Sequence, residues 1–420
     1  MKDLIEAFTR ARMNPLRIFA AAQVSLVLLV NSVSCAIAQT WTLTTAPTNE
    51  YWRAITSSAD GSKLVAVSSN GIYASTNGGA DWIHASAPAT DWSGVASSAD
   101  GIKSVAVVYG GSIYTSADAG STWNATASPS NSWQAVACSG DASKLVAAYG
   151  IQFSPGGLYT STNFGANWTA SIAPTNGFGW YSVASSADGI KLAAMLVDQL
   201  TPAGPYGWIY TSTNAGTTWT QSTRVRWPTF LASSADGTKL AAAIGKGFEI
   251  DSPILTSTNS GLTWATSTIV NAWASIASSA DGTRLTAGTG GLFPAPITGP
   301  IYLSGDSGLT WTATDSPTNS WAAVASSADG CKLVAAVNGG GIYTWQTTPT
   351  PVLSVTPIGG NLVLDWTVPS MTFVLQQTSD LANSNWTNVT ASQTLNPINF
   401  QYRVTTPPPR GTMFYRLVSQ

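Results

Sequence analysis

The sequence is poor in charge. Asp, Glu, Lys and Arg make up 9% of its 420 residues, and the formal net charge is −2. A nucleic-acid-binding surface needs clustered Lys and Arg, which this composition does not supply. Aromatic residues reach 10%, and frequent aromatics with sparse charge are not typical of a disordered chain. We therefore expect a folded protein with no nucleic-acid partner.

Histidine and cysteine are nearly absent, with one His and three Cys. His84 directly follows a repeated turn motif, and the chain has no metal-ligand spacing, phosphate-binding loop or nucleophile elbow. Cys138 and Cys331 occupy positions where sister repeats carry Ser or Thr, and their separation in the array predicts two unpaired thiols. The sequence thus predicts no metal, no cofactor and no catalytic residue.

Long hydrophobic runs are also missing. Residues 18–30 form an apolar stretch of 13 residues, shorter than the roughly 20 that span a membrane. Three arginines precede this stretch and Ala36-Ile37-Ala38 follows it, which is the pattern of a signal peptide over residues 1–38. We expect a secreted, periplasmic or cell-surface protein that is not membrane-inserted after cleavage. Lipid attachment at Cys35 and an uncleaved anchor are alternatives.

What the chain has in abundance is repetition. A phrase close to W-x-x-V-A-S-S-A-D-G-x-K-L recurs seven times at intervals of 40 to 48 residues. A Gly-rich link, the phrase I-Y-T-S and, in six copies, S-x-[ND]-x-G-x-x-W follow it. The Asp of each phrase is Asp60, Asp100, Asp141, Asp188, Asp236, Asp281 or Asp329, and the third phrase is degenerate, "SGDASKL". Four short strands in a period of this length are typical of a propeller blade.

The S-x-[ND]-x-G-x-x-W motif resembles the Asp-box, or BNR repeat, of sialidase-like and photosystem II assembly-factor propellers. The resemblance covers residues 41–346 and implies a β-propeller fold. Four of the six copies have Asn at the Asp position, which an Asx turn tolerates.

The number of strands indicates how the array ends. The Trp of the fourth strand occurs six times after the repeated phrase, whereas the Trp of the first strand occurs seven times. "TWTLTTAPTNEYW" (40–52) parallels "TWTATDSPTNSW" (310–321), so Trp41 is expected to supply the missing Trp, with residues 40–46 pairing with 341–345. We predict an all-β chain: a seven-bladed β-propeller over residues 39–346, closed by the N-terminal strand.

A change in composition follows the repeats. Residues 347–357 are expected to form a Thr/Pro linker, and residues 358–420 a small β-sandwich of five alternating strands. This segment looks like the fibronectin-III-like accessory modules of exported bacterial proteins. It is near the lower size limit for independent stability, so we expect partial docking on the propeller.

Departures from the repeat mark the candidate site. Repeats three to six have lengthened loops between their second and third strands (149–157, 196–207, 244–253 and 289–300), and "STRVRW" is a shortened connection after the fourth repeat. Loops on a rigid scaffold commonly carry binding residues. Ordinary solvated loop charges are the alternative interpretation. The candidate ligand-binding residues are Asp198, Tyr206, Trp208, Arg224, Arg226, Lys246, Glu249 and Asp251.

Two groups of Trp repeat with the motif. The fourth-strand group is expected in the core of the blades. The first-strand group either packs between blades or rings the channel mouth, where it could stack on sugars or apolar side chains. It comprises Trp52, Trp92, Trp133, Trp180, Trp227, Trp273 and Trp321.

The predicted function is that of an exported, non-catalytic, monomeric binding or assembly scaffold for a protein or carbohydrate. The alternative is a sialidase-like glycoside hydrolase, for which Glu50, Tyr51 and Arg53, with Asp91 on the next repeat, are the available side chains. The Arg cluster that such enzymes need is not recognisable among the few arginines of the repeats. A purely structural surface protein is a third possibility.

Overall fold

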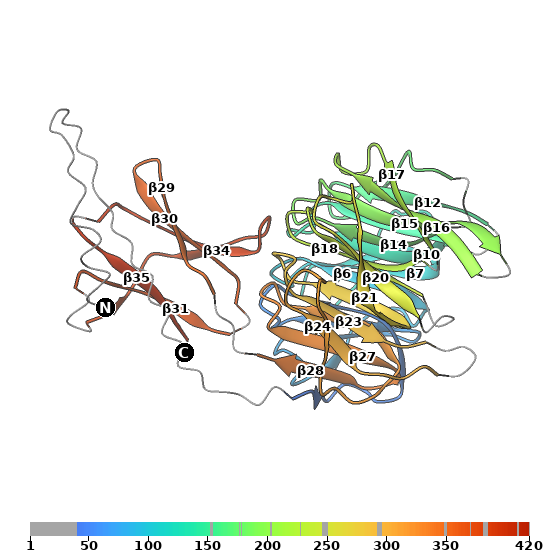
Figure 1. The fold of residues 1–420 in the computed structure, drawn as a ribbon, viewed down its shortest axis with the longest axis horizontal. Coiled ribbons are helices and arrows are strands. Elements are labelled where there is room, and N and C mark those ends of the chain that lie inside the picture. The colour runs from blue at the N-terminus through green and yellow to red at the C-terminus, as the bar shows by residue number, and fades with distance from the viewer. Residues whose placement is uncertain are drawn as a thin grey trace.

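The computed structural model describes residues 40–419 except 152–153, 176, 178, 202–203, 227, 246–250, 292–295, 348–350, 370, 381–384 and 410. The regular elements of the described residues are all strands, β1 to β35 (Figure 1). The all-β prediction is therefore confirmed. No helix in this part of the chain is long and apolar enough to cross a membrane.

Repeats one to six each form four antiparallel strands that pair in chain order, and the seventh forms three. The first strands are β2 (Glu50–Ser57), β6 (Trp92–Ser97), β10 (Asn131–Cys138), β14 (Gly179–Ser185), β18 (Pro228–Ser233), β22 (Trp273–Ser278) and β26 (Trp321–Ser326). The second strands are β3 (Leu64–Ser68), β7 (Ser104–Gly111), β11 (Leu145–Ile151), β15 (Leu192–Thr201), β19 (Leu240–Ile244), β23 (Leu285–Thr289) and β27 (Lys332–Gly340).

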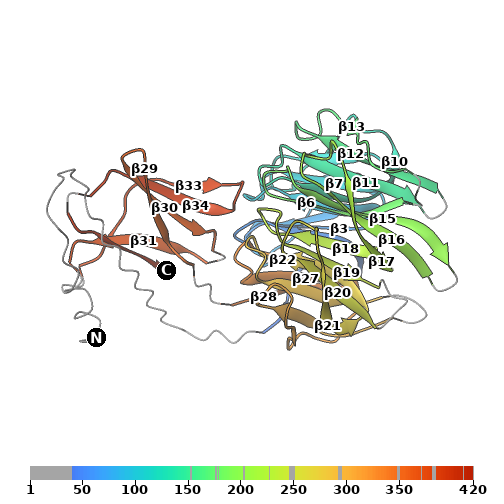
Figure 2. The same ribbon diagram turned by 45° about the horizontal axis from the view of Figure 1, so that its top comes forward.

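The third and fourth strands complete the sheets, which Figure 2 shows from a second direction. The third strands are β4 (Ile72–Ser75), β8 (Ile113–Ser116), β12 (Ser154–Ser161), β16 (Gly204–Ser212), β20 (Ser252–Ser257), β24 (Ile301–Ser304) and β28 (Ile342–Gln346). The fourth are β5 (Ile83–His84), β9 (Asn124–Ala125), β13 (Thr169–Ala170), β17 (Thr220–Arg226), β21 (Ala265–Asn271), β25 (Thr312–Ala313) and, from the other end of the repeat region, β1 (Thr42–Leu43).

The N-terminal strand lies against the last repeat. β1 pairs with β28, Thr42 opposite Thr344 and Leu43 opposite Tyr343, as the sequence comparison predicts. Trp41 packs against Trp321, with ring centroids 6.0 Å apart, and its indole N–H donates to the Thr314 hydroxyl at 3.0 Å.

These contacts of Trp41 repeat elsewhere in the array. Trp219 packs on Trp180 at 6.1 Å and donates to the Ser171 hydroxyl of the preceding repeat at 2.8 Å. Trp41 therefore makes the same two contacts as Trp219, the fourth-strand Trp of the fourth repeat.

Backbone hydrogen bonds join the turns that follow the first strands of successive repeats. In each repeat, the residue before the turn Asp donates its N–H to the matching carbonyl of the next repeat at 2.7 to 2.8 Å, and Ala328 donates to Ala59. We call these residues the axial ring; they are Ala59, Ala99, Gly140, Ala187, Ala235, Ala280 and Ala328.

The turn aspartates are hydrogen-bonded within their own turns. Asp141 accepts from the Ser139 hydroxyl at 2.6 Å and from the backbone and hydroxyl of Ser143. Burial alone raises the pKa of such a carboxyl, but these bonds outweigh it and hold the pKa below its ordinary value. The pKa is lowered in the same way at Asp60, Asp236 and Asp281.

The Asp-box-like turns use either an Asp or an Asn oxygen. Asp118 Oδ1 accepts from the Ser116 hydroxyl and the Thr122 N–H, and Asn163 Oδ1 accepts from the Ser161 hydroxyl and the Asn167 N–H. An amide oxygen supplies the same two acceptor contacts as a carboxylate, so Asn is accommodated at this position.

The lysines of the repeated phrase pack over the next repeat. The Lys63 side chain covers Gly101, and Lys144 covers Gly189 while donating from Nζ to the Asp188 carbonyl at 2.6 Å. Their stems therefore take part in contacts between repeats.

Two antiparallel sheets follow the repeats. One contains β29 (Ser354–Ile358), β30 (Asn361–Thr367), β34 (Gln401–Thr406) and β33 (Gln393–Asn396); the other contains β32 (Thr387–Asn388), β31 (Phe373–Thr378) and β35 (Phe414–Ser419). They share a core around Trp366, Leu375 and Tyr415. β29 begins inside the stretch that composition assigns to the linker, and β29 and β33 are additional to the five predicted strands.

We predict that Trp41→Ala lowers the free energy of unfolding by about 3 kcal/mol, because a large side chain that is only 9% exposed is removed. Trp219→Ala is the matched change, and urea unfolding should give a similar loss for both variants. A loss below about 1 kcal/mol at Trp41 alone would contradict an equivalent role for the two residues.

We also predict that the turn aspartates make the fold acid-sensitive. Their pKa values are lower in the folded protein than the ordinary 3.8, so their stabilisation is complete above that value and is lost as the pH falls through the folded pKa. The melting temperature should be nearly constant from pH 7 to 5 and should decrease below about pH 4. Asp236→Asn should reduce the steepness of this decrease; an unchanged melting temperature at pH 3 would contradict the prediction.

Candidate functional site

The fourth repeat projects further than its neighbours. β15 has 10 residues and β16 has 9, whereas β11 and β12 of the third repeat have 7 and 8, and β19 and β20 of the fifth have 5 and 6. Residues 196–207, predicted as a loop, are thus mostly strand, and β11 and β12 likewise take up much of 149–157. The loop prediction was wrong at both places because the extra residues continue the pairing of the second strand with the third.

The connection after this repeat is short because the fourth strand, like the second and third, is lengthened. β17 runs along the prolonged β16, with Arg224 opposite Trp208 and Arg226 opposite Tyr206. The fourth strand therefore includes residues that, in other repeats, belong to the connection to the next repeat. Side chains at alternate positions of a strand share a face, so these cross-strand pairs lie next to each other on one face.

Arg224 is the centre of the site. The carbon of its guanidinium lies 5.5 Å from the ring centroids of both Tyr206 and Trp208. The same group donates to the Gln199 side-chain oxygen at 2.6 Å, and its side chain is 41% exposed. The guanidinium is thus held against two aromatic rings while still reaching solvent.

Asp198 connects the aromatic and cationic groups. It lies at an irregularity in the pairing of β15 with β16, between Val197 and Gln199, where a bulge redirects the side chain. Its Oδ2 accepts from the Trp208 indole N–H at 2.9 Å, and its Oδ1 lies 3.9 Å from the Arg224 guanidinium. Asp198 therefore orients both residues. We call Asp198, Gln199, Tyr206, Trp208 and Arg224 the aromatic–arginine cluster.

The remaining predicted site residues lie around or outside this cluster. The carbon of the Arg226 guanidinium is 6.0 Å from the Tyr206 ring centroid. Asp251 is exposed directly before β20. Lys246 and Glu249 lie outside the described residues. Gln199 was not predicted, since no repeat pattern distinguishes it; only its place opposite Tyr206 in the hairpin does.

The first-strand tryptophans do not form an accessible ring. Trp52, Trp92, Trp133, Trp180, Trp273 and Trp321 are at most 1% exposed, and Trp227 lies outside the described residues. Each of the six packs against the Tyr of its third strand, with centroids 5.0 to 5.6 Å apart. The core interpretation holds for these six, and stacking on a sugar at the channel mouth does not.

The candidate hydrolase residues are not arranged as a nucleophile and its base. Glu50 accepts a hydrogen bond from Tyr73 at 3.1 Å, while Tyr51 is 60% exposed. Arg53 forms an exposed ion pair with Asp91 at 3.7 Å. The carboxylate that could activate Tyr51 is thus engaged by a different tyrosine, a pairing that sequence spacing does not reveal.

Other reactive groups are few in the described part of the chain. Cys138 and Cys331 are free thiols, and burial raises the pKa of Cys138 to about 12, so its thiolate does not form at neutral pH. The described residues contain no group of three or more His, Cys, Asp or Glu able to hold a metal ion. The aromatic–arginine cluster offers stacking and charge-assisted hydrogen bonds, which are means of recognition.

No family model matches the chain, and no curated protein matches it. Several solved structures have a similar fold. YCF48 from Cyanidioschyzon merolae is 17% identical, with a TM-score of 0.53 over 73% of this chain and 98% of that one. YCF48 bound to D1 peptide is 15% identical, with a TM-score of 0.53 over 73% and 97%.

A third structure belongs to a protein with another name. The β-propeller domain of Myceliophteria thermophila Cps50 (Swd1) is 12% identical, with a TM-score of 0.53 over 74% of this chain and 100% of that one. Identities this low establish the fold alone. The chain thus has an all-β, propeller-like fold.

Proposed function

We propose that the repeats form a closed, seven-bladed β-propeller of Asp-box repeats, with blade seven completed by β1. The axial hydrogen bonds that return from Ala328 to Ala59 support it, as does the β1–β28 pairing. A closed ring leaves no free sheet edge at the junction of the first and last repeats.

We propose further that residues 1–38 are a signal peptide and that the protein is exported. The propeller then spans residues 39–346, and a fibronectin-III-like module follows a short Thr/Pro linker within 347–357, with β29 as its first strand. The apolar stretch with its preceding arginines supports export.

The function proposed for this exported propeller is that of a binding scaffold for a protein partner. The observation that carries the proposal is the aromatic–arginine cluster, an exposed Arg held against Tyr and Trp on a projecting hairpin. Tyr, Trp and Arg are the residue types enriched at the energetic centres of protein interfaces. A guanidinium held in place by Gln199 and Asp198 loses little freedom on binding a carboxylate, so an acidic peptide segment fits the site best.

The similar structures support a protein ligand in general terms. YCF48 has been solved bound to D1 peptide, so a protein of similar fold binds a peptide. The propeller fold by itself does not confer this function, which depends on the residues of the site.

We predict that Arg224→Gln weakens partner binding at least about 30-fold, the loss typical of an interface hot spot. The measurement is affinity for the acidic sequences retained from a peptide array probed with the purified protein, with a glycan array in parallel. Arg53→Gln is the matched control, because Arg53 is also exposed and also paired with an aspartate.

Equal affinity of the Arg224→Gln variant and the wild type would contradict the proposed site. Binding confined to the glycan array would replace the protein partner with a carbohydrate. Turnover of fluorogenic sialosides that is lost on Tyr51→Phe would overturn the non-catalytic assignment altogether.

A further inference from the structure

The third repeat differs from the others at the axial ring. Six members of the ring are Ala, and the third is Gly140. The same repeat has Ala142 where the others have Gly, so that Ala-Asp-Gly becomes Gly-Asp-Ala. This exchange of Ala and Gly within one turn is what makes "SGDASKL" differ from the phrase of the other repeats.

The backbone does not explain this exchange. Ala142 has a φ of 55°, a left-handed conformation that glycine adopts more readily, and the glycines at the equivalent positions have φ of 65° to 68°. Gly140 has no positive φ, and alanine is accommodated at all six equivalent positions. The repeat therefore retains a strained alanine at 142 and a glycine at 140 that its own conformation does not require.

The contact made by Gly140 does explain it. A Cβ atom built on Gly140 would overlap the carbonyl oxygen of Pro397 and lie 2.7 Å from its carbonyl carbon and 2.9 Å from Phe400 Cε1. Backbone atoms cannot rotate away as a flexible side chain can. An alanine at position 140 is thus incompatible with the position of this segment.

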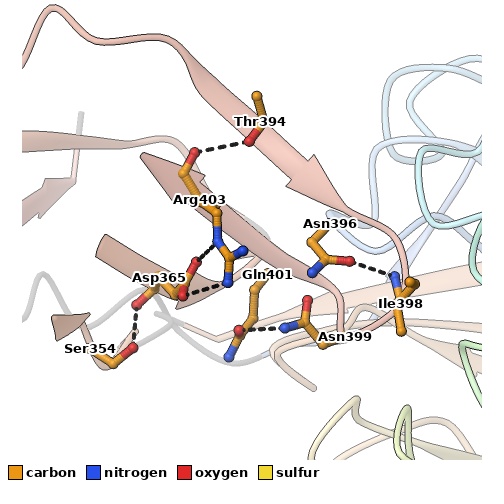
Figure 3. A network of polar contacts seen from close by, with 8 residues as sticks. All are labelled: Ser354, Asp365, Thr394, Asn396, Ile398, Asn399, Gln401 and Arg403. Atoms are coloured by element: carbon orange, nitrogen blue, oxygen red, sulfur yellow. Dashed lines mark hydrogen bonds and ion pairs between the residues drawn. The ribbon is translucent and has the colours of Figure 1, made fainter. Parts of the chain in front are cut away.

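The segment belongs to the C-terminal sheets. Residues 397–400 form the turn between β33 and β34, shown in Figure 3, where Asn396 Oδ1 accepts from the Ile398 N–H at 3.0 Å and Asn399 donates to Gln401 at 2.7 Å. Arg403 of β34 pairs with Asp365 of the neighbouring β30 through two hydrogen bonds of 2.7 and 3.0 Å. These bonds hold the turn in one shape within its own sheet.

A small apolar cluster joins this turn to the axial ring. Ala59, Ala99, Ala328 and Val368 are buried together, and Leu395, Phe400 and Tyr402 pack against them. Val368 N–H also donates to the Phe400 carbonyl at 2.9 Å, which fixes Phe400 relative to β30. The contact therefore includes turns from opposite ends of the repeat region and residues on both sides of the C-terminal turn.

We propose that the axial ring is a docking site for the turn 397–400 of the same chain, and that Gly140 is the position that makes this docking possible. The turn covers the side of the repeats that carries the Ala-Asp-Gly turns. The tip of the β15–β16 hairpin lies at the other ends of the strands, and Figure 1 shows the C-terminal sheets and the far end of β16 on opposite sides. Docking thus holds the C-terminal module away from the aromatic–arginine cluster.

The test restores the consensus residue in the full chain. Gly140→Ala should release the turn, so small-angle X-ray scattering should show a larger radius of gyration and a longer maximum dimension than for the wild type. Gly305→Ala is the matched control, because it also restores a residue type found in a sister repeat, in open space. It should scatter as the wild type does.

A second variant leaves the ring untouched. Replacing residues 397–400 by Asn-Gly keeps the β33–β34 hairpin, since these two residues form a tight two-residue turn, and removes the docking segment. This variant should expand as Gly140→Ala does. If the Asn-Gly variant scatters as the wild type does, the docking site is overturned. If the Asn-Gly variant expands but the Gly140→Ala variant does not, the role of Gly140 is overturned. Because neither variant alters the cluster around Arg224, failure here is distinguishable from failure of the proposed function.

Discussion

The fold depends on the hydrogen bonds that link neighbouring repeats at the axial ring. Each ring residue uses its N–H toward one neighbour and its carbonyl toward the other, at 2.7 to 2.8 Å. Six of the seven ring residues are buried, so the pairing satisfies backbone groups that would otherwise be costly to bury. Residues that bring seven backbones this near must be small, and Ala or Gly occurs at every member of the ring.

This constraint acts on one end of the strands. At the other end, neighbouring repeats pair only over short segments, β2 with β27 and β10 with β7. The Asp-containing turns adjoin the ring, and their side-chain bonds recur with little change from repeat to repeat. Among the described residues, β15 and β16 pair only within their own four-stranded sheet. The fourth repeat could therefore lengthen β15 and β16 and draw β17 along with them, without altering the buried Trp180–Tyr210 packing beneath. Variation, and with it the candidate site, lies at that end.

Sequence reasoning succeeded where the physics is local and repeated. Trp41 and its pairing partner could be inferred because the same turn and Trp spacing recurs along the chain, and Asn in the Asx turn followed from its acceptor oxygen. It failed on residues 196–207, where the extra length suggested a loop but cross-strand packing of Trp208 and Arg224 favours strands. Nor could it explain Gly140, because the residue that requires it is about 260 positions away, a distance no spacing pattern spans.

The docked C-terminal turn and the aromatic–arginine cluster lie at opposite ends of the strands. The C-terminal turn occupies the axial end, where small residues and turn backbones offer shape but little charge. The aromatic–arginine cluster lies on the far hairpin, where Asp198 and Gln199 already hold the guanidinium in place before any ligand arrives. A partner that binds there meets a preorganised cation and two aromatic faces, and it does not have to displace the C-terminal sheets. In the proposed scaffold, attachment of the C-terminal module and recognition of a second molecule therefore use opposite ends of the strands, because the axial hydrogen bonds lie at one end only.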